Sequence, residues 1–276
     1  MRILEIRNDK GPVKWILIGI SILFLMVMLV LPLVYVIYTA LREGWDVFVS
    51  SVTDEYAVKS IALTIQVTVI TVIINSVFGI FAAWLITRFQ FRGKKIISTL
   101  IDLPLTISPI IAGLIFVLTF GRQSAIYPFL EKTGIQIIFA VPGIVLATIF
   151  VTFPFISREI IPVLTVKGTD EEEAAALMGA NGFQIFTRIT FPHIRWAFLY
   201  GIVLCSARAM GEFGAVSVLS GHLRGITNTM PLYIELLYQA FDFTGAFAMS
   251  AILVIMALVI LILKNIFESS MRKSEG

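Results

Sequence analysis

The long polar connection between two apolar parts of this chain reads Thr169-Asp-Glu-Glu-Glu-Ala-Ala-Ala-Leu-Met-Gly-Ala-Asn-Gly-Phe-Gln-Ile-Phe-Thr-Arg-Ile-Thr-Phe-Pro192. Thr169 and Glu172 have the spacing of a capping box, and the four acidic residues 170–173 suit the positive end of a helix dipole. Ala174, Ala175 and Ala176 then favour helix. A short helix is therefore predicted to begin directly after Thr169.

The second half of this stretch predicts a turn and another helix. Gly179, followed by Asn181-Gly182, is typical of a tight turn after a helix end. A second short amphipathic helix is expected from Phe183, ending before Pro192. Two short helices joined at a sharp angle between apolar segments indicate a docking element for another protein.

The composition of the chain indicates a membrane protein. Of its 276 residues, 58% are hydrophobic and 14% are charged, whereas soluble domains are about 25% charged. A span needs roughly 20 apolar residues. Six stretches meet this length and predict an all-α integral membrane protein with six transmembrane helices: 15–41, 60–87, 103–121, 133–157, 196–221 (apolar except for Arg208 and Glu212) and 243–263.

Positive charges predict the orientation of these spans, because Lys and Arg collect on the cytoplasmic side. With a cytoplasmic N-terminus, the outer loops hold only Arg42, Lys59, Arg122, Lys132 and Arg224, and Arg208 lies within a span. Every other Lys and Arg falls inside, so both termini and the 157–195 connection are predicted to be cytoplasmic. The first span is longer than a signal-peptide core, and Thr39-Ala40-Leu41 is a poor cleavage site, so we expect it to be retained.

Polar residues inside the second and third spans are candidates for a solute path. Thr64, Thr68, Thr71 and Asn75 share one helical face; such residues either bond helices together or line a path. In the third span, Pro104 and Pro109 are expected to break the helix, which a membrane tolerates where the freed groups face protein or a wet cavity. Thr106 and Ser108 would supply hydroxyls at that break.

Two acidic residues within the spans are expected to be paired. Asp102 lies near the cytoplasmic end of the third span, and its expected partner is Lys94 or Lys95. Glu212 follows Arg208 by one helical turn, so these two side chains can pair on one face. An arginine at mid-span indicates either a role in the transport path or a structural ion pair between helices.

Several chemistries are disfavoured by the sequence. It contains no G-x-x-x-x-G-K-[ST] phosphate-binding loop, no H-E-x-x-H and no G-x-S-x-G. Cys205 is the single cysteine, and His193 and His222 lie at opposite ends of the fifth predicted span. We therefore expect no catalytic residue, no metal site and no cofactor bound by this chain, and an intramembrane enzyme is poorly supported.

Part of the polar connection resembles the E-A-A-x3-G-x9-I-x-L-P signature of permease subunits of bacterial ABC importers. The matching residues are Glu173-Ala174-Ala175, then Gly179 after three residues, then Ile189-Thr-Phe-Pro192 after nine more. Phe191 stands where the signature has Leu. The resemblance implies a type I ABC importer permease fold, with the stretch as the cytoplasmic coupling helix that docks on an ATPase subunit. The implied coupling residues are Glu173, Ala174, Ala175, Gly179, Ile189 and Pro192.

The same resemblance divides the chain. Residues 58–266 would form the transmembrane domain with its five-helix core. Residues 1–57 would hold a cytoplasmic N-terminus, an extra first span and an outer loop. Residues 267–276 would be a cytoplasmic tail.

Four further segments look like the W-type permease of the sulfate/thiosulfate importer: 153–162 (FPFISREIIP), 195–201 (RWAFLYG), 207–216 (ARAMGEFGAV) and 220–225 (SGHLRG). This resemblance implies a subunit that couples ATP hydrolysis elsewhere to import of sulfate or thiosulfate across a bacterial inner membrane. It implies as partners a T-type permease, two ATPase subunits that bind the ATP and Mg²⁺, a periplasmic sulfate-binding protein and membrane lipid; no nucleic acid is expected.

Two alternatives stay open. The core 208–214 (RAMGEFG) is also similar to molybdate and tungstate permeases. A different class, an ATP-independent anion channel or exchanger, would not need the coupling element. The candidate anion path comprises Arg208, Glu212, Thr106, Ser108, Thr64, Thr68, Thr71 and Asn75.

Overall fold

The structure is a computed structural model that describes the backbone of residues 12–274 and the side chains of 14–266. Within these residues every regular element is helical. Arg2, Arg7 and Lys10, which contribute to the predicted orientation, lie outside the described residues. So do the side chains of Arg272 and Lys273 in the predicted tail, 267–276.

Five continuous helices in the described part are long and apolar enough to cross a membrane. The first, Lys14–Leu41, joins α1 (Pro12–Leu25) to α2 (Leu31–Leu41) through a π-helical turn, Met26–Val30. The others are α4 (Glu55–Arg88), α8 (Val141–Lys167), the helix from Gly182 to Met210, and α14 (Phe243–Ser274), of which Phe243–Ile266 is the candidate span. Each of the five overlaps one of the six predicted spans, but α8 covers Val141–Lys167 where 133–157 was predicted, so it starts and ends later in the sequence than expected.

The third predicted span is a bent pair of helices. α5 (Lys94–Thr106) and α6 (Pro109–Phe120) meet at 111°. Pro109 causes the break, because a proline disfavours helical backbone at the residue before it, and Ser108 is extended there with ψ 133°. The prediction that Pro104 also breaks the helix is wrong: Pro104 lies inside α5.

The fifth predicted span also differs at both ends. α11 (Phe191–Met210) stops eleven residues before position 221, the predicted end, and after a break the chain continues as the short α12 (Gly214–Leu219). At its start, α10 (Gly182–Ile185) runs into α11 through a π-helical turn, Phe186–Thr190. The prediction that a helix ends before Pro192 is therefore wrong. Pro192 lies in the first turn of α11, where the N–H that proline lacks is least needed.

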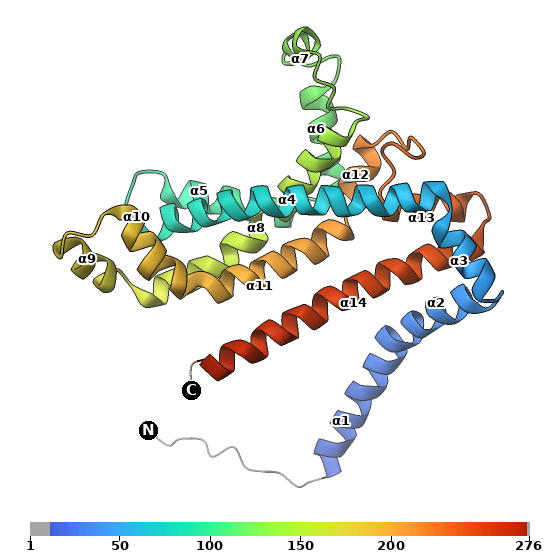
Figure 1. Cartoon of the computed structure of the whole chain (residues 1–276), viewed down its shortest axis with the longest axis horizontal. Coiled ribbons are helices and arrows are strands. Elements are labelled where there is room, and N and C mark those ends of the chain that lie inside the picture. The colour runs from blue at the N-terminus through green and yellow to red at the C-terminus, as the bar shows by residue number, and fades with distance from the viewer. Residues whose placement is uncertain (1–11, 275–276) are drawn as a thin grey trace.

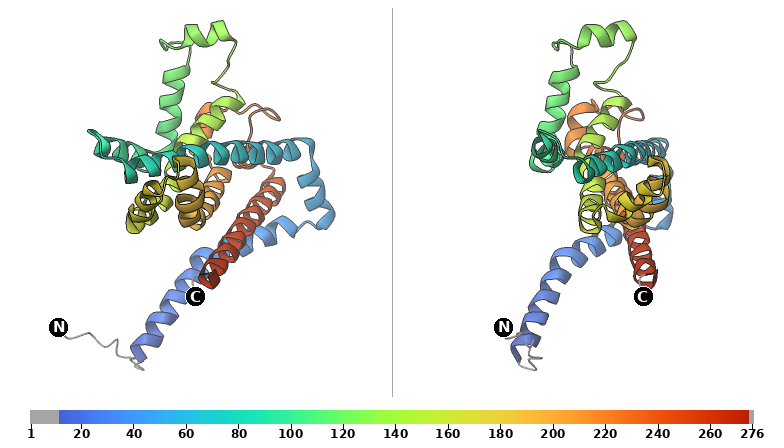
Figure 2. Two further views of the ribbon diagram at one scale, coloured as in Figure 1. Left: turned by 60° about the vertical axis from the view of Figure 1, so that its left-hand side comes forward. Right: turned by 90° about the vertical axis from the view of Figure 1, so that its left-hand side faces the viewer.

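The helices form an elongated bundle with two distinct ends (Figure 1). α3 (Trp45–Thr53) and α13 (Met230–Gln239) lie at one end, and α9 (Asp170–Leu177) and α10 lie at the other. α4, α8 and α11 pack together in the middle, while α2 packs on α14. Both further views show α6 leaving the bundle, with α7 (Tyr127–Thr133) at its far tip (Figure 2).

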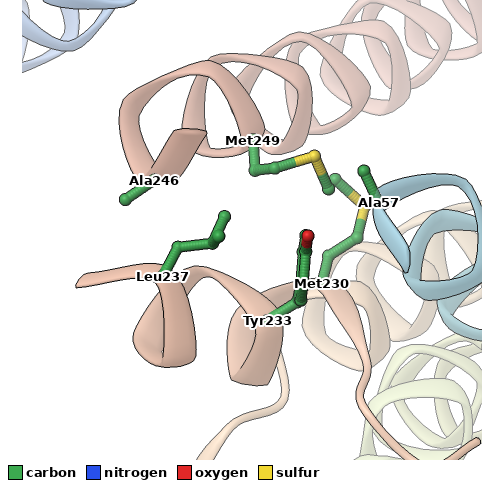
Figure 3. Close-up of a cluster of buried hydrophobic side chains, with 6 residues drawn as sticks. All are labelled: Ala57, Met230, Tyr233, Leu237, Ala246 and Met249. Atoms are coloured by element: carbon green, nitrogen blue, oxygen red, sulfur yellow. The ribbon is translucent and has the colours of Figure 1, made fainter. Parts of the chain in front are cut away.

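A buried cluster joins α13, α14 and the start of α4. Met249 reaches from α14 toward Met230 and Ala57, and Tyr233 and Leu237 point from α13 toward α14 (Figure 3). Tyr233 also donates a hydrogen bond to Asp54, whose carboxylate caps α4 by accepting from the backbone N–H of Tyr56. Apolar packing and one helix cap therefore fix the α13 end of the bundle.

Most of the apolar side chains on the candidate spans are exposed within this single chain. Within the 18-residue apolar segment of each candidate span, 50% of the residues are buried in α8, 28% in α4 and in α14, and 0% in the first span. Contiguous apolar surface of this extent needs apolar surroundings. Lipid or a neighbouring membrane subunit would provide them, which fits the membrane class that the composition predicts.

Gly201 on α11 allows a close approach to α8, because an added Cβ would lie 2.9 Å from the Cα of Ile156. We expect Gly201→Val to destabilise the fold by about 1–3 kcal/mol through overpacking, and to lower the melting temperature of the detergent-purified protein. Gly19→Val is the matched control, since nothing lies within 4 Å of a Cβ at Gly19. Equal melting temperatures for the two variants would contradict the close packing.

Candidate functional site

The connection between α8 and α11, which we call the docking loop (residues 168–190), folds as a short helix, a tight turn and the beginning of a second helix. α9 begins at Asp170, and Gly179 takes the left-handed conformation with φ +89°. Asn181 then accepts from the backbone N–H of Gln184 (2.9 Å), while the Gln184 side chain accepts from the Asn181 N–H (3.0 Å). The predicted helix after Thr169 and the tight turn are confirmed. The second helix begins near the predicted position and carries this capping box, but it continues into α11 and is not a separate short helix.

The capping box predicted for the first helix is wrong. The hydroxyl of Thr169 donates to the carboxylate of Glu173 at 2.6 Å, and Thr169 makes no side-chain cap. Glu172 turns away from Thr169 because it has a stronger partner, the guanidinium of Arg88 at the end of α4: the Nε–Oε2 distance is 2.8 Å. A charge-assisted pair is favoured over a neutral cap.

The coupling residues implied by the resemblance lie within the docking loop, except for Pro192, and differ in exposure. Glu173, Ala174 and Gly179 are exposed, as is Pro192 just beyond it, whereas Ala175 is buried and Ile189 is half-buried. Around them stands an apolar patch formed by Val166, Leu177, Met178 and Phe183, whose side chains are 77–91% exposed. The patch and the exposed signature residues share the α9 end of the bundle (Figure 1).

A second contact, between Glu171 and His193, also links the docking loop to α11. The His193 Nε2 lies 2.8 Å from a Glu171 carboxylate oxygen. This hydrogen bond, together with the charge of a protonated ring, lowers the pKa of Glu171. The Glu171 side chain is 64% exposed, so water screens this pair and its contribution to stability is small.

At the opposite end of α11 the predicted Arg208–Glu212 pair is confirmed at 2.6 Å. Glu212 is buried, and its other oxygen accepts from the backbone N–H of Ala215 in the first turn of α12 (2.9 Å). The Arg208 side chain remains 33% exposed. One carboxylate therefore holds the cation and satisfies the backbone at the break between α11 and α12.

The two helix breaks adjoin each other. An added Cβ at Gly214 would lie 2.9 Å from the Pro109 side chain, so the start of α6 presses on the start of α12. Thr106 and Ser108 at the α5–α6 break are exposed, as expected for candidate path residues, although the Thr106 hydroxyl donates to the Leu103 carbonyl. The structure thus brings Thr106 and Ser108 to the same region as Glu212.

The predicted polar face of α4 is buried. The Thr64 hydroxyl accepts from the backbone N–H of Met230 (2.8 Å), and the Asn75 amide donates to Thr152 on α8 (2.8 Å). The hydroxyls of Thr68 and Thr71 are buried without a hydrogen-bond partner in the described part of the chain. Thr64 and Asn75 therefore connect this helix to its neighbours, while the buried hydroxyls of Thr68 and Thr71 make no such bond.

Reasoning from the sequence missed several ion pairs, and two of them join side chains that are far apart in the sequence. Asp102 does not pair with Lys94 or Lys95; its carboxylate lies 2.9 Å from the Nε of Arg158 on α8. The Arg88–Glu172 pair was missed as well, because its partners are 84 positions apart. The one signal for it was an arginine at the end of a predicted span on the same side as a cluster of acids.

Comparisons with known proteins agree with this arrangement. The family described as "Binding-protein-dependent transport system inner membrane component" matches residues 75–273. The chain is 44% identical to "Sulfate transport system permease protein CysW" of Escherichia coli (strain K12) over 272 residues, covering 98% of this chain and 94% of that protein. It is 45% identical to the protein of the same name from Synechococcus elongatus over 268 residues, covering 97% and 94%.

A solved structure shows the same fold at low identity. A chain in the "Crystal structure of bacterial alginate ABC transporter in complex with alginate pentasaccharide-bound periplasmic protein" matches with a TM-score of 0.77 and 20% sequence identity, covering 92% of both chains. The arrangement of spans and docking loop is thus the type I ABC importer permease fold. The chain belongs to the family of inner-membrane components of binding-protein-dependent transport systems.

Proposed function

We propose that this chain is the membrane subunit of an ATP-driven importer for sulfate or thiosulfate. The observation that carries the proposal is the exposed apolar patch at the α9 end, where Leu177 and Met178 lie between two candidate spans and Val166 and Phe183 lie in the terminal residues of those spans. Side chains such as Leu177 and Phe183 are costly to leave in water, at about 25 cal/mol per Å² of apolar surface, so a partner that covers them is expected. The chain has no phosphate-binding loop, and the partner would therefore supply the nucleotide chemistry.

The placement of positive charge supports a cytoplasmic docking loop. Arg88, Arg92 and Lys167 lie near the α9 end, and Lys59 and Arg224 lie near Tyr56 at the opposite end. The excess of Lys and Arg at the α9 end is typical of the cytoplasmic side. We place both termini in the cytoplasm of a bacterial cell and the spans in its inner membrane.

The partners follow from the family and from the relatives. Binding-protein-dependent transport implies an ATPase and a soluble binding protein. We propose two ATPase subunits that hold ATP and Mg²⁺, a T-type permease as the second membrane subunit, and a periplasmic sulfate-binding protein. The similarity to permeases named for sulfate transport supports sulfate as the substrate class.

Transport would proceed by alternating access. Closure of the ATPase subunits moves the docking loops, and the spans then open outward to receive the anion. Sites along the path should bind weakly, because a tight site would trap a dianion. Arg208 is suited to such a site: it is partly exposed, and Glu212 offsets its charge. The N-terminus of α6 at Pro109 adds a partial positive charge beside it.

The remaining path candidates divide into two groups. The first group comprises Thr106 and Ser108, whose exposed hydroxyls suit brief contact with a hydrated anion, and Thr68 and Thr71, whose unpartnered hydroxyls are buried and would meet an anion only if the helices part. Thr64 and Asn75 are engaged with Met230 and Thr152, and we assign them the structural role of connecting helices.

Uptake of radiolabelled sulfate into proteoliposomes that contain the full complex tests the substrate. We expect ATP-dependent sulfate uptake that unlabelled thiosulfate competes away. Stronger competition by molybdate than by thiosulfate would favour a molybdate or tungstate permease instead. Uptake that persists without ATP would favour a channel or exchanger.

Glu173→Lys and Gly179→Asp test the docking loop. The first reverses a charge on the exposed face of α9, and the second puts a side chain where φ is +89°, a backbone strain of about 1–2 kcal/mol. We expect each to reduce co-purification of the ATPase by about tenfold or more, as at a central interface residue. Glu131→Lys on α7 is the control, and wild-type co-purification and uptake in all three variants would contradict the docking role.

Arg208→Gln combined with Glu212→Gln tests the anion path. The glutamine at 212 can still accept from the Ala215 N–H, so the helix break stays capped while both charges are removed. We expect normal assembly with sulfate uptake reduced by roughly tenfold, the scale of a typical coupling free energy. A wild-type uptake rate in the assembled double variant would remove the pair from the path.

A further inference from the structure

The last turn of α4 holds the docking loop through a single arginine. The guanidinium of Arg88 makes two contacts with the carboxylate of Glu172 on α9: Nε lies 2.8 Å from Oε2, and Nη2 donates to Oε1 at 3.0 Å. Its remaining nitrogen, Nη1, donates to the backbone carbonyl of Leu164 in the last turn of α8, also at 3.0 Å. The Nε contact is an ion-pair contact, and the two donating nitrogens are Nη1 and Nη2, which bond to different elements. Because these two donors are held in one rigid plane, they fix direction as well as distance.

Glu172 extends the same connection to a fourth element. Its Oε1 also accepts from the hydroxyl of Thr190 at 2.8 Å, in the π-helical turn that leads into α11. The side chains of Arg88 and Glu172 are only 9% and 16% exposed. One shielded ion pair therefore joins the ends of α4 and α8, the docking helix α9 and the start of α11. We call these four residues, Arg88, Leu164, Glu172 and Thr190, the clamp.

The chain on either side of α9 is less constrained. Gly168 and Gly179 flank the helix with φ +69° and +89°, and a Cβ at either glycine would meet no atom within 4 Å. The Glu171–His193 contact reaches α11 as well, but Glu171 is mostly exposed. Among these connections, the clamp is the shielded and multiply bonded one that reaches α4.

We infer that Arg88 is a positioning residue that transmits the motion of α9 to α4 and α8. This inference rests on the proposed function, because it assumes that an ATPase moves the docking loop. With the clamp intact, α9 cannot turn without pulling the ends of both helices. Without it, α9 stays docked but swings on its flanking glycines, so ATP is hydrolysed while the spans do not follow.

Arg88→Gln and Glu172→Gln in the reconstituted full complex test the inference. We expect ATPase co-purification close to wild type, and a rise of at least about fivefold in ATP hydrolysed per sulfate imported, the low end of typical coupling effects. The double variant should be no worse than either single one, since the two residues act as a unit. Arg88→Lys, which keeps the charge but not the rigid plane of donors, should restore part of the coupling.

Glu171→Gln is the matched control, because it removes the neighbouring exposed contact between the same helix and α11. Its ratio of ATP to sulfate should remain within about twofold of wild type, as expected for a screened pair. The inference about Arg88 is overturned if the Gln variants hydrolyse as little ATP per imported sulfate as the wild type does. It is also overturned if Arg88→Lys and both Gln variants lose the ATPase, which would indicate a purely structural role.

A distance measurement separates this inference from the proposed function. Spin labels at Asp170→Cys and Gln90→Cys report on α9 and on the chain two residues past the end of α4, and the native Cys205 is buried. We expect a narrow distance distribution in the assembled complex and a broad one with Arg88→Gln. If the wild-type complex imports no sulfate, the substrate proposal fails, yet these distributions still decide the clamp; equal widths would overturn it.

Discussion

In a membrane, every backbone N–H and C=O needs a partner from the protein itself, and this demand governs where the chain can depart from regular helix. The two internal breaks, α5–α6 and α11–α12, occur side by side and are each supported. Proline removes a donor at Pro109, and the buried carboxylate of Glu212 receives the N–H of Ala215. Breaks that are paired and supported in this way leave irregular backbone where it faces protein or a path rather than lipid.

The approximate positions of the spans could be predicted from the sequence, but the places where a span bends or breaks could not. Charge-free stretches locate apolar chain, and 103–121 is equally apolar whether α6 continues α5 or turns by 111°. The same limit applies to residues 196–221, where hydropathy does not register the break after Met210. The docking loop was predictable because glycine, the Asn181-Gly182 turn and a run of acids are local signals that act within a few residues.

The contacts of the candidate site also differ in whether a local sequence pattern could predict them. The Arg208–Glu212 pair lies at i, i+4 and follows from helical spacing. Glu172 was misassigned to Thr169 because the capping-box pattern considers the nearest residues alone, whereas Arg88 arrives from 84 positions away. Asp102 was misassigned for the same reason: nearby lysines were available, and Arg158 on α8 was nearer in space. Long-range ion pairs depend on helix packing, which no local pattern encodes.

Buried Glu212 and partly buried Glu172 have different roles, because the partner of Glu212 is close in sequence and the partners of Glu172 are distant. Glu212 lies at the break after α11 and binds Arg208, four positions earlier on that helix, so its ion pair adjusts a local charge and restrains one break. Glu172 binds a residue of another helix and a hydroxyl of a third element, so its pair relates whole helices to one another. Breaking either would leave a shielded charge without its partner, which is costly. In the case of Glu172, that cost opposes any motion of α9 relative to α4. A force that displaces α9 therefore displaces α4 with it.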